Sequence, residues 1–152
     1  VIEIGVPAQH VTTIDHDMEL PTKEFNPERE FKGQKFVHNK AKDSTWSDFR
    51  ISGFKCRDTT IADNTQNVAG VQVVRPNGNA IKPSKHDCDI LFNFVMEGKM
   101  TLKASGQPSN ELTSGDAFVI PPDLLTEYSN LSEDLELLEV SLPGKFKTYY
   151  DA

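Results

Sequence analysis

The chain has 152 residues, of which 37% are hydrophobic and 26% are charged, and its formal net charge is −7. This balance is typical of an ordinary globular domain, and the apolar runs are far too short to span a bilayer. Scattered acidic residues repel phosphate backbones and anionic membrane surfaces, so we expect neither nucleic acid nor a membrane as a partner. The length predicts one domain around a single core.

The cysteines and the first residues of the chain indicate the compartment. Cys56 and Cys88 lack the spacing of a redox or zinc motif and are too few for a disulfide framework, so we expect two reduced thiols. The first 20 residues contain no basic region followed by an apolar core, so no secretory signal is visible. A soluble, cytoplasmic protein is expected.

Residues 1–48 form the first of two predicted parts. This segment is polar and interrupted by proline and glycine, which predicts an extended N-terminal arm that packs on its own domain or on a second subunit. The arm carries three histidines without recognisable ligand spacing, and we interpret them as exposed loop residues: His10, His16 and His38.

Residues 49–152 form the second predicted part, an all-β domain. Short runs rich in Val, Ile and Phe alternate with breaks at Gly, Pro, Asn, Asp and Ser, as in "DILFNFVMEG" and "DAFVIPP". Such runs indicate an antiparallel sandwich or barrel. The segment "SEDLELLEV" has a helix-like composition, but its alternating apolar residues before a Pro-Gly break favour a strand.

Two sets of turn residues keep a fixed spacing. The first set is Gly78, Ser84, His86, Leu91 and Gly98, and the second set is Gly115, Pro121, Asp123, Thr126 and Asn130. In order and spacing, both sets resemble the two motifs of the cupin superfamily, and the stretch from Phe54 to Pro143 resembles small single-domain bacterial cupins. The resemblance implies a cupin-type double-stranded β-helix, or jelly-roll barrel, and a homodimer.

The same alignment places other residue types where metal-binding cupins have their ligands. Those enzymes use a His-x-His pair, an acid or amide, and a final histidine, whereas this chain has Ser84, His86, Leu91 and Thr126 at these positions. A single imidazole does not offset the loss of an ion's hydration, and neutral hydroxyls are poor ligands for iron, nickel or zinc. We therefore expect no metal at the usual site and no other cofactor.

Strand alternation predicts which side chains line the interior. The predicted inward residues are Ser84, His86, Leu91, Asn93 and Thr126, with Lys82 at the mouth as a positive charge for an acidic ligand. His86 is the candidate catalytic residue, although a hydrogen-bonded interior histidine is the simpler interpretation. A carboxylate or a backbone carbonyl that fixes its tautomer would suit it to act as a general acid or base.

Three functions remain open. The first is a degenerate cupin that binds a small, partly apolar molecule in the barrel, which would fail if the protein's own side chains fill the interior. The second is a metal-free isomerase, epimerase or lyase that uses His86 as general acid or base. The third is a metal-dependent enzyme with a site rebuilt around His86 from Cys88, an aspartate or an arm histidine.

Overall fold

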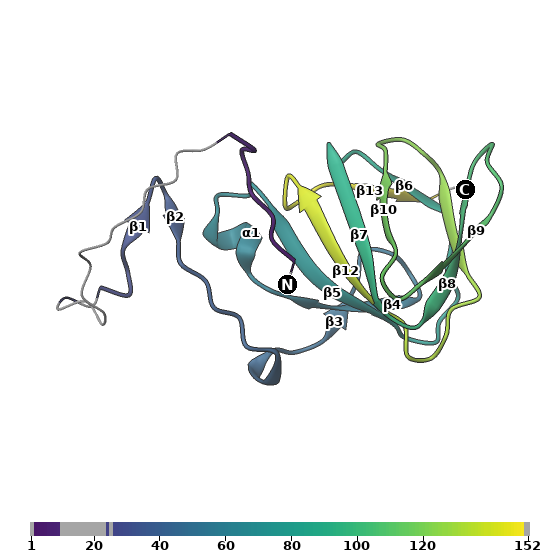
Figure 1. Cartoon of the computed structure of the whole chain (residues 1–152), viewed down its shortest axis with the longest axis horizontal. Coiled ribbons are helices and arrows are strands. Elements are labelled where there is room, and N and C mark those ends of the chain that lie inside the picture. The colour runs from purple at the N-terminus through teal and green to yellow at the C-terminus, as the bar shows by residue number, and fades with distance from the viewer. Residues whose placement is uncertain (1, 10–23, 25, 151–152) are drawn as a thin grey trace.

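The computed structural model describes residues 2–9, 24 and 26–150, and Figure 1 shows the arm projecting from one side of a body of β-strands. The arm contains a short hairpin and one turn of 3-10 helix: β1 (Glu30–Phe31), β2 (Gln34–Lys35) and η1 (Ala41–Asp43). A single α-helical turn, α1 (Ile61–Asn64), lies between two strands of the body. No described helix is both long and apolar enough to cross a membrane.

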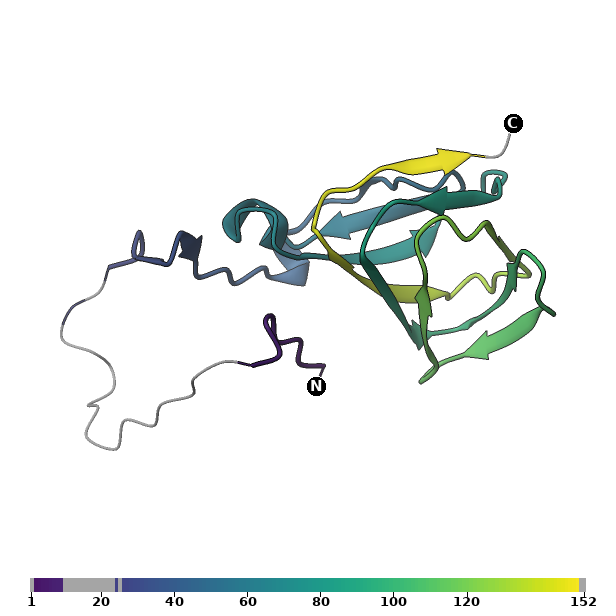
Figure 2. The same cartoon turned by 90° about the horizontal axis from the view of Figure 1, so that it is seen from above.

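Two antiparallel sheets make up the body, and Figure 2 shows them from above. The larger sheet contains β3 (Ser47–Asp48), β4 (Phe54–Asp58), β5 (Gly70–Pro76), β7 (Ile90–Glu97), β10 (Ala117–Ile120) and β12 (Glu136–Leu142), in the order β10-β7-β12-β5-β4-β3. The smaller sheet contains β6 (Ser84–His86), β8 (Lys99–Ala104), β9 (Asn110–Thr113), β11 (Thr126–Ser129) and β13 (Thr148–Tyr150), in the order β13-β6-β11-β8-β9.

This arrangement confirms the predicted all-β jelly roll and refines two details. Among the described strands, no pairing joins one sheet to the other, so the interior is that of a two-sheet sandwich rather than a closed cylinder. Ser47 and Asp48, which the sequence places in the arm, pair with β4 at the edge of the larger sheet. The strand expected in "SEDLELLEV" is confirmed as β12, which lies between β5 and β7.

The core follows from alternation along β7 and its neighbours. Leu91, Asn93 and Val95 are buried on the inner side, whereas Phe92 and Phe94 point outward and are only partly covered. The same alternation continues on β12, where Leu137 and Glu139 face inward. One strand pattern therefore produces both a filled interior and an apolar outer surface.

Gly98, the residue that closes the first motif, makes the tight turn between β7 and β8 possible. Its φ is +77°, a left-handed conformation that favours glycine. A Cβ at this position would lie 2.7 Å from the Cα of Leu135, which belongs to the chain that packs against the turn. Both the backbone conformation and the close approach therefore require glycine.

We predict that Gly98→Ala lowers the free energy of unfolding by about 3 kcal/mol, because left-handed strain adds to overpacking. Gly78→Ala is the matched control, since Gly78 has φ +82° but no atom within 4 Å of the added Cβ. The control should lose only about 1 kcal/mol. Urea unfolding of both variants measures the difference, and equal losses would contradict the packing role of Gly98.

Candidate functional site

All five residues predicted to point into the interior are buried. Ser84 and His86 come from β6, Leu91 and Asn93 from β7, and Thr126 from β11, and each is at most 4% exposed. Lys82 precedes β6 and is exposed, so it does not belong to this buried group.

His86 is held in one tautomer by the backbone. The N–H of Cys88 donates to Nδ1 of His86 over 3.1 Å, so Nδ1 carries the lone pair and Nε2 carries the proton in the neutral ring. His86 is 2% exposed, and its Nε2 has no hydrogen-bond partner among the described residues. The neutral imidazole therefore has a buried N–H that meets no acceptor with hydrogen-bond geometry among the described residues.

The surroundings of His86 keep the ring neutral. Burial lowers its pKa, and the charge of Arg50 adds to this effect. The carbonyl of Ile120 partly opposes the fall, although it does not meet hydrogen-bond geometry with Nε2. Because protonation at Nδ1 would also oppose the Cys88 N–H, His86 is suited to donate a hydrogen bond rather than to accept a proton.

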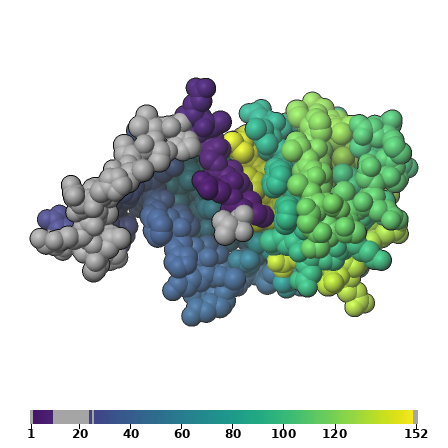
Figure 3. All heavy atoms as spheres, in the orientation of Figure 1, coloured from purple at the N-terminus to yellow at the C-terminus, as the bar shows by residue number. Residues whose placement is uncertain are grey.

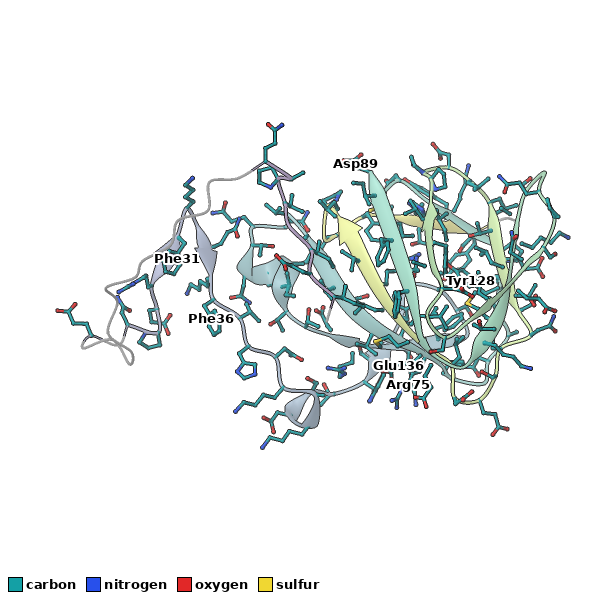
Figure 4. All side chains as sticks on the ribbon, viewed as in Figure 1. Phe31, Phe36, Arg75, Asp89, Tyr128 and Glu136 are labelled. Carbon is teal, nitrogen blue, oxygen red and sulfur yellow. The ribbon has the colours of Figure 1, made fainter. Side chains whose placement is uncertain are left out.

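Asn93 supplies a second unused donor. Its side chain is 1% exposed, and Nδ2 has no hydrogen-bond partner among the described residues. The residue lines a cavity of about 10 Å³ together with Tyr128 and Glu139. A volume of this size holds roughly one water molecule. Figure 4 shows Tyr128 within the body of strands.

The sequence analysis missed an ion pair between Glu139, which is buried, and Arg50, whose side chain is 18% exposed. Arg50 Nε donates to Glu139 Oε1 over 3.2 Å, and a second, shorter bond joins the other guanidinium nitrogen to Oε2. Burial alone would lower the pKa of Arg50, but the carboxylate of Glu139 outweighs burial and raises it. A glutamate on the inward side of an apolar strand was the available sequence signal, because a buried carboxylate requires a partner.

Arg50, which precedes β4, also contacts side chains from the C-terminal part of the chain. Its guanidinium lies 4.9 Å from the ring centroids of both Phe49 and Phe146 and donates to Oγ1 of Thr148 over 3.2 Å. Tyr150 accepts a hydrogen bond from the backbone N–H of Ser52 over 3.0 Å. We call residues 49–52 the closing segment, because Phe49 and Ile51 line the small cavity and β13 holds the segment in place.

The hydroxyl groups of Ser84 and Thr126 are poor candidates for metal ligands. Thr126 Oγ1 already donates to the carbonyl of Ser84 over 3.2 Å, and Leu91 offers no donor atom. No group of three or more His, Cys, Asp or Glu side chains that could hold an ion occurs among the described residues. His10 and His16 lie outside the described residues. The donor set at the family's usual position therefore does not fit a metal ion.

Cys88 packs as a small buried residue beside His86. Its Sγ lies 3.0 Å from the carbonyl oxygen of Ile90 and 3.1 Å from that of Leu142, both of which can accept from the thiol. Burial raises the pKa of Cys88, which keeps the thiol protonated. These contacts give Cys88 no role as a nucleophile or ligand.

Solved structures identify the fold. The chain is similar to KdgF from Halomonas sp., with 18% identity, a TM-score of 0.58, and coverage of 73% of this chain and 96% of that one. An RmlC-like cupin from Shewanella frigidimarina matches with 16% identity and a TM-score of 0.56, over 73% of this chain and 94% of that one. The protein has a cupin fold.

A further cupin neighbour is Streptomyces PAC13, whose histidine variant was solved with uridine. It has 12% identity and a TM-score of 0.60, over 76% of this chain and 90% of that one. No family model matches the sequence, and no curated protein matches it. At these identities, the comparisons establish the cupin fold and leave the activity open.

We predict that Arg50→Met lowers the free energy of unfolding by about 3 kcal/mol, because it leaves the buried carboxylate of Glu139 unpaired. Glu139→Leu should lower it less, because the guanidinium of Arg50 is partly exposed. The double variant should lose much less than the sum of the two losses, since it removes both charges. Asp63→Asn breaks the exposed pair with Lys145 and serves as a control that should change little. Urea unfolding of the wild type, the two single variants and the double variant completes a double-mutant cycle. Additive losses of stability at positions 50 and 139 would contradict the pairing.

His86 should make stability depend on pH. Because its folded pKa is lowered, the unfolded state binds more protons, and the free energy of unfolding should fall as pH drops below the ordinary value of about 6.5. Relative to His86→Gln, the wild type should therefore lose stability between pH 7.5 and pH 5.5. His38→Gln, at an exposed arm position, is the matched control. Parallel stability curves for the wild type and His86→Gln would contradict the lowered pKa.

Proposed function

We propose that this cupin binds a small, partly apolar molecule that presents hydrogen-bond acceptors to His86 Nε2 and Asn93 Nδ2. The observation that carries the proposal is that both donors are buried and have no hydrogen-bond partner within residues 2–9, 24 and 26–150. Leaving a buried donor unpaired costs roughly 1–3 kcal/mol, so two such groups in one interior are expected where a ligand supplies the acceptors. The proposal places no metal at the family's usual position, because the donor set there does not fit one.

The rest of the interior defines the ligand's other requirements. Phe54, Val74 and Leu137 form apolar walls around the cavity beside Asn93. Glu139 is already paired with Arg50, so the site offers unused donors rather than unused charge. A carbonyl, ether or carboxylate oxygen attached to an apolar ring or chain therefore suits the interior better than a cation.

The protein's own side chains fill the interior in this structure, which counts against binding as first expected, so the proposal requires the closing segment to move before a ligand can bind. The cavity of about 10 Å³ is far smaller than the few hundred cubic ångströms of a typical ligand pocket. Phe49 and Ile51 line this cavity, so displacement of residues 49–52 would enlarge it directly. We therefore expect a ligand to bind only when the closing segment moves and the Arg50–Glu139 ion pair separates.

A metal-free isomerase, epimerase or lyase is the second candidate. Its support is that the cupin neighbours include enzymes, among them Pac13, described as a unique nucleoside dehydratase. Against it stands the tautomer of His86, because the Cys88 N–H occupies the lone pair of Nδ1 and leaves a proton on Nε2. A general base at Nε2 would need the opposite tautomer, so the geometry favours binding.

We predict that Asn93→Leu raises the free energy of unfolding of the ligand-free protein by roughly 1 kcal/mol, because it removes an unpaired buried donor. Asn110→Leu is the control, since Asn110 is exposed on β9 and its amide donates to the carbonyl of Pro108. Urea unfolding measures both variants. A large loss of stability in Asn93→Leu would mean that the amide has a structural partner, and the proposal would lose its main support.

Binding itself can be followed by NMR at the two donors. Benzoate supplies acceptors on an apolar ring, and uridine is the molecule bound in the PAC13 structure. We expect at least one probe to shift the side-chain amide resonance of Asn93 and the backbone resonance of His86, while Asn110 stays unchanged. The proposal is contradicted if neither probe shifts either resonance. It is also contradicted if the backbone resonances of positions 86 and 93 shift equally in His86→Phe/Asn93→Leu, which lacks both donors.

A further inference from the structure

Phe146 lies between the buried imidazole of His86 and a hollow at the surface. The two rings meet edge to face, with their centroids 5.8 Å apart. Phe146 also lines an open hollow of about 520 Å³ beside Asp87 and Lys147, whereas His86 is not part of the lining. One half-buried ring therefore separates this hollow from a donor that has no partner among the described residues.

Residues 146–150, which we call the β13 segment, include this ring and the strand that follows it. β13 is the edge of the smaller sheet and pairs on one side only, with β6. β6 carries Ser84 and His86, and Thr148 lies opposite His86. Figure 2 shows β13 in yellow along one side of the body, and Figure 3 shows the opposite side, where β7 and β10 pack against each other. The β13 segment therefore covers the site at a sheet edge, where a short strand can detach without breaking the central pairing.

The β13 segment also holds the closing segment in place. The hydroxyl of Tyr150 donates to the carbonyl of Arg50 over 2.5 Å and accepts from the N–H of Ser52 over 3.0 Å. Thr148 Oγ1 accepts from the guanidinium of Arg50 over 3.2 Å. Because these bonds join the backbone and the side chain of one segment to the other, we expect the two segments to move together.

Asp87 fixes the β13 segment from the side of β6. Its carboxylate accepts from the N–H of Lys147 over 2.7 Å and from the hydroxyl of Tyr149 over 3.1 Å. Its own N–H donates to the carbonyl of Lys147 over 3.3 Å. All three residues are exposed, so water competes for these bonds. A region held by exposed hydrogen bonds and few buried apolar contacts opens at a lower free-energy cost than the core strands.

The chain just before the β13 segment is fixed to the rest of the body. The N–H of Gly144 donates to the carbonyl of Asn67 over 3.1 Å, and the N–H of Lys145 donates to the side-chain oxygen of Asn67 over 2.6 Å. A Cβ at Gly144 would lie 2.6 Å from the Cβ of Ala62, so the backbone packs closely there. Displacement of the β13 segment is therefore expected to begin after Lys145.

We propose that the β13 segment is the lid of the interior, which detaches from β6, releases the closing segment and opens a path from the hollow past Phe146 to His86. Asp87 and Tyr150 are the positioning residues of this lid, because they hold it to β6 and to the closing segment. The inference rests on the proposed function only for the ligand that would follow this path. The motion itself occurs in the ligand-free protein and can be tested there.

Native-state amide hydrogen exchange of the ligand-free full chain tests whether the two segments open as one unit. Asp87→Ala removes contacts to the β13 segment, and Asp87 has no hydrogen bond to the closing segment. It should nevertheless speed exchange of the Phe49 amide, which donates to the carbonyl of Phe54, at least about threefold. Tyr150→Phe should speed it about tenfold, because both bonds of the hydroxyl are lost. Amides inside β7 and β12 should exchange as in the wild type.

Carbethoxylation by diethyl pyrocarbonate, which attacks a neutral imidazole, measures access to His86 directly. Exposed His38 is the internal reference, and initial rates are compared by mass spectrometry. Asp87→Ala and Tyr150→Phe should raise the rate at His86 by the same factors as the exchange. Asp134→Ala is the control, since Asp134 is exposed and makes no ion pair with any described residue, and it should leave the rate unchanged.

Three results would overturn the lid. The first is unchanged exchange at Phe49 in Asp87→Ala, which would mean that the two segments open independently. The second is faster exchange without faster labelling of His86. The third is equal acceleration inside β7 and β12, because His86 would then be reached only by global unfolding. If exchange and labelling rise as expected but neither benzoate nor uridine binds, the lid is supported and the proposed function alone fails.

Discussion

The ion pair between Arg50 and Glu139 is the interaction on which the interior depends. It joins the segment before β4 to the middle of β12, two parts of the chain far apart in sequence. Because Phe49 and Phe146 stack on the same guanidinium, the pair also positions the aromatic side chains that close the interior. The pair matters more than a surface pair because the carboxylate of Glu139 is buried and would be left without a partner if Arg50 were removed.

The interior closed by Arg50 and Glu139 also differs chemically from the interior of a metal-binding cupin. Metal-binding cupins gather several N and O donors around an open coordination position, whereas this chain presents Leu91, two neutral hydroxyls and one imidazole fixed by the Cys88 N–H. What remains is an interior whose unused groups are hydrogen-bond donors. In the function that we propose, these donors meet the acceptor atoms of a ligand once the closing segment has moved.

Much of the fold could be predicted because it depends on local patterns. Alternation along β7 correctly placed Leu91 and Asn93 inside, and the glycine at position 98 indicated the turn that the structure contains. The inward burial of Ser84, His86 and Thr126 followed from the same reasoning. Lys82, expected at the mouth, is exposed because it lies in the loop before β6 begins.

The closure of the site could not be predicted, because it depends on contacts between distant segments. Arg50 reads as an ordinary surface residue at the edge of the arm, and only the folded chain brings it to Glu139. The tautomer of His86 is likewise set by a backbone N–H two residues away, a geometric detail without a sequence signature. The small size of the cavity follows from how Phe49, Ile51 and Phe54 fill it together.

A high-resolution crystal structure of untagged protein, purified without added metal, tests the central claim most directly. We expect an organic molecule whose acceptor atoms lie within hydrogen-bond distance of His86 Nε2 and Asn93 Nδ2, with residues 49–52 displaced. A metal ion bound to His86 would show that the proposed function is wrong. So would an interior in which protein groups or ordered water alone satisfy both donors while the closing segment stays in place.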